Sequence, residues 1–342
     1  MTTLSQVAAH AGVTSATVSN VLRERGRVGA DTRARVLAAI EELGYRPHLT
    51  ARALAEGRAP TLALMVASIA NPFYPQFALA AEQAARQHGR FLVVCNTNDD
   101  PDIGRSYLHQ IAGTLSDGVL IMNANLHFDD LHKAAQRGTP VVLCMWEKPH
   151  APPGLPCIAV DFYLAGAIAA RHLVTLGHGR RGSIGIIVGG GRHGVHAERQ
   201  RGFVDELARL GRAEAALAPL HVDDTIEGGY AAAAALLAAT PSLTAIFATN
   251  DLPALGALHA AADRGLQIPH DLSVIGITDI ALAHQTRPAL STVAVPTAEA
   301  AAMAVALLMA LVADPHQPAP VRVASPPWLV ARASTGPPRA GA

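Results

Sequence analysis

Residues 3–22 of the chain read TLSQVAAHAGVTSATVSNVL, and their spacing indicates two short helices joined by a tight turn. Thr3 followed by Gln6 forms a capping box, which marks the start of the first helix. The apolar residues that follow fall at i, i+3 and i+4 and therefore share one face: Leu4, Val7 and Ala8. Gly12 supplies the turn, because glycine adopts a positive φ at little cost.

The second predicted helix buries one face and presents a small polar one. Thr14 is expected to cap it through its hydroxyl, and Val18, Val21 and Leu22 repeat the apolar spacing. The side chains on and around the outer face are short: Ser15, Ala16, Thr17, Ser19 and Asn20. Such a helix can approach base edges in the major groove, where an amide suits adenine and a methyl group suits thymine. A generic helical bundle explains the apolar spacing, but not a polar second helix after a glycine turn.

A third helix is predicted after this pair, with Asp31 as its N-cap and Gly44 as its end. Residues 1–60 hold eight arginines and five acidic residues, whereas the whole chain has no net charge. A modestly basic head on a slightly acidic body fits a protein that contacts phosphates at one end. A solvated arginine-bearing helix surface would give the same charge balance.

The run from Leu4 to Leu54 resembles the lactose-repressor (LacI/GalR) family of bacterial transcription regulators, and the resemblance continues over almost the whole chain. The matching residues are Val7-Ala8, Ala11-Gly12-Val13, Ala16-Thr17-Val18-Ser19, Val21-Leu22, Thr32-Arg33, Val36, Leu43-Gly44-Tyr45, Pro47 and Ala51-Arg52-Ala53-Leu54. The resemblance implies a helix-turn-helix DNA-binding domain over 1–59 that binds double-stranded operator DNA as a homodimer. The residues expected to contact DNA are Thr3, Thr14, Ser15, Ala16, Thr17, Ser19, Asn20, Arg52 and Leu54.

Within that domain, the resemblance implies a hinge helix at about 48–57 that forms on the operator. Leu54 would be the apolar wedge pushed into the minor groove; the alternative is a leucine packed against the effector domain. His48 stands where the family commonly has Asn, which leaves the backbone contact at this position open.

Beyond residue 60 the chain has an α/β pattern, and its 342 residues suffice for two or three domains. Apolar runs typical of buried parallel strands alternate with helical stretches. The expected strands are Thr61–Ala67, Phe91–Cys95, Gly118–Met122, Pro140–Met145, Cys157–Val160, Ser183–Val188, Thr244–Ala248, Leu272–Ile277 and 290–295, and Thr297–Val312 is expected to be a helix. Residues 334–342 are rich in proline and glycine and are expected to form a disordered tail.

The resemblance implies that residues 60–333 form a two-lobed effector domain like a periplasmic binding protein. We expect the N-lobe to comprise about 60–160 and 291–320, and the C-lobe about 161–290 and 321–333. The chain would then cross between lobes near residues 160, 290 and 320, with a small ligand held between them.

Ligands of open α/β sheets bind outside the carboxyl ends of the strands, so polar residues that follow strands are site candidates. The polar candidates are Asn71, Asp161, Asn250 and Thr278, and Phe73 and Tyr74 are aromatic candidates that can stack on a sugar or base. The resemblance singles out Asn250 again and adds Arg199, whose guanidinium offers paired donors to a carboxylate, phosphate or vicinal hydroxyls. The alternative role for Phe73 is to pack in the hydrophobic core. The alternative role for Arg199 is to form a salt bridge within the lobe.

One departure from the family bears on the ligand. The family usually has an Asp that binds sugar hydroxyls where this chain has Thr278, and threonine carries no charge. We therefore expect the effector to be a sugar held differently or a sugar acid, and we hypothesise an acidic one.

Other classes of function are less well supported. Gly189, Gly191 and Gly194 match G-x-G-x-x-G, but the strand before them is not the first of a Rossmann unit, and no acidic residue ends a second strand. His193 and His196 lack a third metal ligand. We expect no enzyme activity, cofactor or metal, no membrane span and no signal peptide, and hence a cytoplasmic regulator, nucleoid-associated when bound to DNA. A transport-type solute-binding protein and, less well, an NAD-dependent enzyme are the alternatives.

Overall fold

The computed structural model describes residues 2–22, 26–45, 61–112, 114–122, 125–147, 154–190, 194–315, 317–318 and 320–339. It divides into two compact units, Met1–Pro60 and Thr61–Ala342. The expected hinge helix, with His48, Arg52 and Leu54, lies outside the described residues, as do Gly191 and His193.

The first unit contains three helices in its described residues, α1 (Leu4–Ala11), α2 (Ser15–Leu22) and α3 (Ala30–Glu42). The capping box is present, since the Gln6 N–H donates to Thr3 Oγ1 at 3.3 Å and the Thr3 N–H donates to Gln6 Oε1 at 2.8 Å. Their buried faces meet in one small core made of Val7, Ala8, Ala11, Val18, Val21, Val36, Ala39 and Tyr45.

The predicted N-cap of the third helix is wrong by two residues. Its N-cap is Gly29, and Asp31 lies in the first turn. An acidic side chain there still stabilises the helix, because it faces the positive end of the helix dipole.

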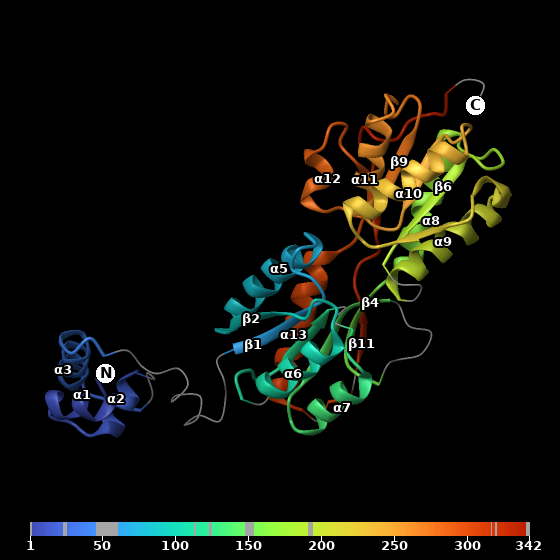
Figure 1. The fold of residues 1–342 in the computed structure, drawn as a ribbon. Helices are drawn as coiled ribbons and strands as arrows, with labels where there is room; N and C mark the ends of the chain where they lie inside the picture. Colours follow the sequence, from blue (N-terminus) through green and yellow to red (C-terminus); the bar gives the residue numbers. More distant parts are fainter. Residues whose placement is uncertain are drawn as a thin grey trace. The chain divides into compact units, whose positions relative to one another are not determined.

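The second unit is built on two six-stranded sheets (Figure 1). The first sheet, in the N-lobe, is parallel throughout, and its helices are α5 (Phe73–Gln87), α6 (Pro101–Ile111), α7 (Phe128–Gln136) and α13 (Thr297–Ala313). Its strand order is β11 (Val321–Val323), β5 (Cys157–Val160), β4 (Val141–Glu147), β3 (Val119–Met122), β1 (Thr61–Val66) and β2 (Phe91–Asn96). Side chains alternate along β1, so Leu62 and Leu64 share a core with α5 and α13, whereas Ala63 and Met65 share one with α6 and α7.

The second sheet, in the C-lobe, is parallel except for its edge strand β12, which pairs antiparallel to β10. Its order is β12 (Trp328–Val330), β10 (Ser291–Ala294), β9 (Ser273–Thr278), β8 (Ala245–Ala248), β6 (Ile184–Gly189) and β7 (Leu220–Val222). The helices of this lobe are α8 (Phe162–Leu176), α9 (Val195–Arg209), α10 (Ile226–Ala239), α11 (Asp251–Ala262) and α12 (Ala281–Gln285).

The strand order corrects two of the expected lobe crossings. β10 belongs to the C-lobe sheet, so the second crossing follows Ala294 rather than residue 290. β11 belongs to the N-lobe sheet, so the third crossing follows Val323 rather than residue 320. The first crossing lies between the end of β5 at Val160 and the start of α8.

The expected disordered tail is also corrected over its first residues. Ser334 is 0% exposed, accepts a hydrogen bond from the Ser291 N–H at 2.7 Å, and donates to the Val274 carbonyl at 2.6 Å. The Gly336 carbonyl lies 2.9 Å from Nε2 of the buried His178. The start of this proline- and glycine-rich segment is therefore an ordered extension that packs on the C-lobe, because its polar groups form hydrogen bonds with it.

Two helix pairs of the C-lobe pack backbone against backbone through glycines. A Cβ at Gly166 of α8 would lie 1.9 Å from the carbonyl oxygen of Arg199, and a Cβ at Gly202 of α9 would lie 1.9 Å from that of Tyr163. Gly229 and Gly256 serve α10 and α11 in the same way. Side chains larger than hydrogen would force these helices apart.

Candidate functional site

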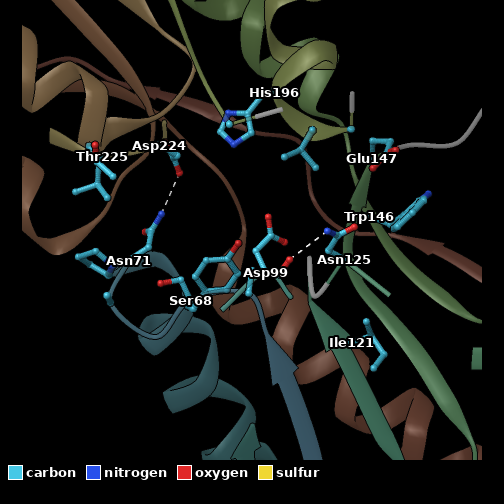
Figure 2. Close-up of a pocket in the computed structure, with 18 of the residues that line it drawn as sticks. Ser68, Asn71, Asp99, Ile121, Asn125, Trp146, Glu147, His196, Asp224 and Thr225 are labelled. Carbon is cyan, nitrogen blue, oxygen red and sulfur yellow. Dashed lines mark hydrogen bonds between the residues drawn. The ribbon is translucent and has the colours of Figure 1, made fainter. Parts of the chain in front are cut away.

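A cavity of about 920 Å³ lies between the two lobes of the second unit. Its N-lobe lining comes from the residues after β1, β2 and β3 and from the end of β4; the C-lobe contributes the segments after β6 and β7 and the start of α9 (Figure 2). Polar and aromatic residues in the lining are Ser68, Asn71, Tyr74, Asp99, Asn125, Phe128, Trp146, Glu147, His196, Asp224, Thr225 and Glu227. The carboxyl ends of both parallel sheets therefore face one space, as ligand sites of this architecture do.

Asp224 links the two lobes across this cavity. Its Oδ2 accepts from Nδ2 of Asn71 in the N-lobe at 3.0 Å and from Nδ2 of Asn250 in the C-lobe at 2.7 Å (Figure 2 draws the bond from Asn71). Its Oδ1 is buried and has no hydrogen-bond partner among the described residues. A Cβ at Gly189 would lie 2.6 Å from that oxygen, so the glycine makes room for the carboxylate. Burial raises the pKa of Asp224, and the amides of Asn250 and Asn71, with the charge of Arg199, oppose the rise.

Arg199 lies behind Asp224 and is 2% exposed. Its Nη1 donates to the Thr249 carbonyl at 2.8 Å, and its guanidinium carbon lies 4.6 Å from the centre of the Phe162 ring. Burial lowers the pKa of Arg199 to about 10, which leaves it charged at neutral pH. Its Nε has no hydrogen-bond partner among the described residues, so this N–H group is available to donate a further hydrogen bond.

His196 contributes a neutral ring to the lining. Its Nδ1 lies 3.1 Å from the Thr249 hydroxyl. Burial, followed by the charge of Arg199, lowers the pKa of His196 to about 3. The imidazole therefore carries no charge at neutral pH and offers ligands a hydrogen-bonding ring.

Asp251 holds the end of β9 in place beneath Asn250. Its carboxylate accepts from the Ile280 N–H at 2.9 Å and the Thr292 hydroxyl at 2.6 Å. The hydroxyl of Thr278 lies 2.9 Å from Asn250 Oδ1 and 3.2 Å from Asp251 Oδ2. Thr278 has a φ of 124°, a conformation that costs free energy in a β-branched residue and that these bonds maintain. Burial raises the pKa of Asp251 to about 6.

The six predicted effector-site residues have four different placements. Asn71 lines the cavity, whereas Asn250, Thr278 and Arg199 form the hydrogen-bonded layer behind it. Phe73 is 5% exposed and lies in the N-lobe core, which is the alternative considered for it, and its neighbour Tyr74 lines the cavity instead. Asp161 caps α8 by accepting from the Leu164 N–H at 2.8 Å and is not among the lining residues.

Several lining residues were missed in the sequence. Asp224 follows β7, whose three residues are too short a run to stand out as a strand. Trp146 and Glu147 belong to β4, which extends two residues beyond its predicted end at Met145. Asp99 follows β2 in a turn with a left-handed φ of 58°, and the signal that could have found it was its place after a predicted strand.

In the first unit, α2 presents the predicted DNA-contacting face. Thr14, Ala16 and Asn20 are exposed, as is Thr3 before α1, whereas Ser15, Thr17 and Ser19 are half-exposed. The Thr14 hydroxyl accepts from the Thr17 N–H at 3.2 Å, which places Thr14 as the cap of α2.

Among the described residues, no cluster of three or more His, Cys, Asp or Glu has the arrangement of a metal site. Within the same residues, no helix is long and apolar enough to cross a membrane. Cys95, Cys144 and Cys157 are buried and form no disulfide.

Two family models match the chain. The model described as "Periplasmic binding proteins and sugar binding domain of LacI family" matches residues 59–315. The model described as "Bacterial regulatory proteins, lacI family" matches residues 3–48. Together they cover the head and most of the two-lobed body.

Characterised relatives match over nearly their full length. The HTH-type transcriptional regulator DegA of Bacillus subtilis (strain 168) is 32% identical, with 98% of both chains covered. The HTH-type transcriptional repressor PurR of Edwardsiella ictaluri (strain 93-146) is 31% identical, with 90% of both chains covered. These relatives are transcriptional regulators and not enzymes.

Solved structures share the fold. The Lac repressor dimer bound to operator and the anti-inducer ONPF matches with a TM-score of 0.85 at 25% identity, over 98% of this chain and 99% of that one. A complex of the transcriptional regulator CelR with cellobiose matches with a TM-score of 0.71 at 28% identity, over 98% of this chain and all of that one.

Proposed function

Because the chain belongs to the LacI family of bacterial regulatory proteins and is a DNA-binding transcriptional regulator, we propose that a small sugar sets its affinity for operator DNA. The sugar binds in the cavity between the lobes. The observation that carries this proposal is the bridge from Asn71 through Asp224 to Asn250, which ties both lobes together at the cavity. A ligand that competes for these groups acts on both lobes at once.

The cavity lining supports a sugar rather than the sugar acid hypothesised from Thr278. Thr278 uses its hydroxyl on Asn250 and Asp251, so it is not a vacant place for a ligand carboxylate. The lining contains four carboxylates and, among its described members, no lysine or arginine. Amides and aromatic faces such as Asn71, Asn125 and Trp146 suit hydroxyl groups and sugar rings. The complex of CelR with cellobiose gives a similar protein with a sugar ligand.

Signal transfer follows from a two-state movement of the lobes. A sugar that binds one arrangement of the lobes better shifts the population toward it, and the operator-binding affinity changes by the same coupling free energy. We propose that the partner in this change is a second copy of the chain, as in the Lac repressor dimer. The regulator acts as a repressor in the cytoplasm, associated with the nucleoid when it is bound to DNA.

On the operator, α2 of each subunit lies in the major groove, with half-sites about 34 Å apart. Asn20 and Ala16 face the base edges, while Thr3, Thr14, Ser15, Thr17 and Ser19 surround them. Arg52 and Leu54 contact the DNA from the hinge segment. Asn20 is the side chain that can both donate to and accept from an adenine edge.

A gel-shift titration with the DNA upstream of the gene tests the proposal. We expect binding that weakens steeply with salt and that changes when a sugar from a thermal-shift screen is added. Asn20→Ala should weaken binding to the preferred site by about 1–3 kcal/mol, and Ala38→Ser, an exposed position of α3, should not. DNA binding that is absent at low salt, or indifferent to every sugar that stabilises the protein, would contradict the proposal.

A further inference from the structure

The interlobe cavity holds negative charge that its described lining does not neutralise. Asp99, Glu147, Asp224 and Glu227 line it, and no lysine or arginine is among the described lining residues. His196 is neutral at physiological pH, since burial lowers its pKa to about 3. Among the described lining residues, the charge facing a ligand therefore comes from these carboxylates.

Two of the four carboxylates have an explanation within the protein. Glu227 lies in the first turn of α10, where an acidic side chain is stabilised by the helix dipole. Asp224 has the buried cation Arg199 behind it and amide donors on one oxygen, although its other oxygen is buried without a partner among the described residues.

Asp99 and Glu147 have no compensating cation among the described residues. The backbone of Asp99 is fixed, because its N–H donates to the Ala67 carbonyl at 3.1 Å and its carbonyl accepts from Asn125 Nδ2 at 3.2 Å. Neither carboxylate forms a salt bridge with a cation of the described residues, and burial raises the pKa of each. Repulsion from Glu198 raises the pKa of Glu147 further. Both groups would be stabilised by a positive charge delivered from solution.

Glu147 lies apart from the interlobe bridge, and Asp99 lies between the two. Figure 2 shows Glu147 and its neighbour Trp146 on the side of the cavity away from Asn71 and Asp224, with Asp99 in the middle. One part of the cavity thus offers hydrogen-bonding amides and the other offers negative charge beside an aromatic ring. A single ligand that reaches across the cavity would meet both.

We propose that the effector is an amino sugar, whose protonated amine lies against Asp99 and Glu147 while its hydroxyl groups reach Asn71 and Asp224. The assignment rests on the proposed function, since it names the chemical class of the sugar. An ammonium group forms charge-assisted hydrogen bonds with carboxylates, and the ring of Trp146 can stack on the sugar face and attract the cation. An acidic sugar would place like charges together in the same half-buried space.

Calorimetric titration of the full chain tests this with matched sugars. The probes are D-glucosamine and its β-1,4-linked dimer, their N-acetylated forms, D-glucose, cellobiose and D-glucuronate. We expect at least one free amine to bind about tenfold or more tightly than its neutral counterpart, since a hydrogen bond to a charged group contributes that much. The difference should shrink as salt is added.

Variants locate the charge recognition. Glu147→Gln and Asp99→Asn should each remove most of the preference for the amine and leave the affinity for the neutral sugar within about twofold. Glu227→Gln removes the same charge from the same lining and should keep the preference. A preference that survives both Glu147→Gln and Asp99→Asn would overturn the assignment.

The outcomes separate the two proposals. Glucose, cellobiose or glucuronate binding as tightly as the amines, with a change in operator affinity, overturns the amino sugar and keeps the sugar-controlled regulator. No binding by any member of the series overturns the amino sugar assignment, and operator release by a ligand that is not a sugar would overturn the sugar as well.

Discussion

Replacing Gly202 with alanine should damage the C-lobe at the contact that positions Arg199. The new Cβ would lie 1.9 Å from the Tyr163 carbonyl oxygen, which is backbone and cannot rotate away. α8 and α9 must then separate by more than 1 Å to restore an ordinary contact. Arg199 lies one turn before Gly202 on the same helix, so the guanidinium moves with it.

The size of the effect follows from two opposing quantities. Overpacking costs about 1–3 kcal/mol, and a clash with rigid backbone belongs at about the upper end of that range. Alanine returns about 1 kcal/mol through its better helix propensity. The net loss of about 2 kcal/mol corresponds to a melting temperature lower by about 3–4 °C for a unit of this size.

Differential scanning calorimetry measures the stability, and titration with the best-binding sugar measures the site. Gly104→Ala is the matched control, because its Cβ would meet side chains and not backbone: Leu126 at 2.6 Å from Cδ2 and 3.2 Å from Cγ, and Thr97 at 3.5 Å from Cγ2. We expect the control to stay within about 1 °C of the natural protein, and Gly202→Ala to lose both stability and affinity. A Gly202→Ala protein as stable as the control would refute the idea that this close contact holds the helices.

Three further predictions concern buried groups. Arg199→Ala should erase the rise in melting temperature that the best-binding sugar causes. Arg199→Lys should keep part of that rise, because lysine retains the positive charge but lacks the planar guanidinium. The same rise in both variants would count against a role for the Arg199 guanidinium in sugar binding. The raised pKa of Asp251, about 6, means that the folded chain holds a proton that the unfolded chain has already released between pH 4 and 6. The contribution of Asp251 to the free energy of unfolding therefore falls as pH rises through 6. In urea titrations, the free energy of unfolding of Asp251→Asn should rise by about 3 kcal/mol relative to that of the natural protein between pH 4 and 7. Parallel profiles of unfolding free energy against pH for the two proteins would contradict this. Deleting residues 334–342 should cost several kcal/mol in the same titrations, about 1–3 for each buried polar group left unpaired. A loss below about 1 kcal/mol would show that the docked extension contributes little to stability.

Much of the fold could be predicted because its signals are local and repeated. The capping box at Thr3 and the glycine turn at Gly12 fix the head within a few residues. Long buried strands such as β1 and β9 are continuous apolar runs, which only a covered parallel sheet explains. These signals need no knowledge of distant parts of the chain.

The rest depends on partners far away in the sequence. β11 and β12 have three residues each and partly exposed faces, so only their neighbours in the sheets identify them. Ser334 is ordered by Ser291 and Val274, which a compositional argument cannot see. Asp224 becomes a site residue only because Asn71, 153 positions earlier, lies opposite it.

The bond between Asn71 and Asp224 also bears on sensitivity. A ligand that needs either group must first displace a contact the protein makes with itself, so part of its intrinsic affinity is spent on opening that contact. The apparent dissociation constant is the intrinsic one divided by the fraction of molecules in which the groups are available. The internal bond thus works as a threshold setting, and changes at position 71 or 224 offer a way to move the effector concentration at which the regulator responds.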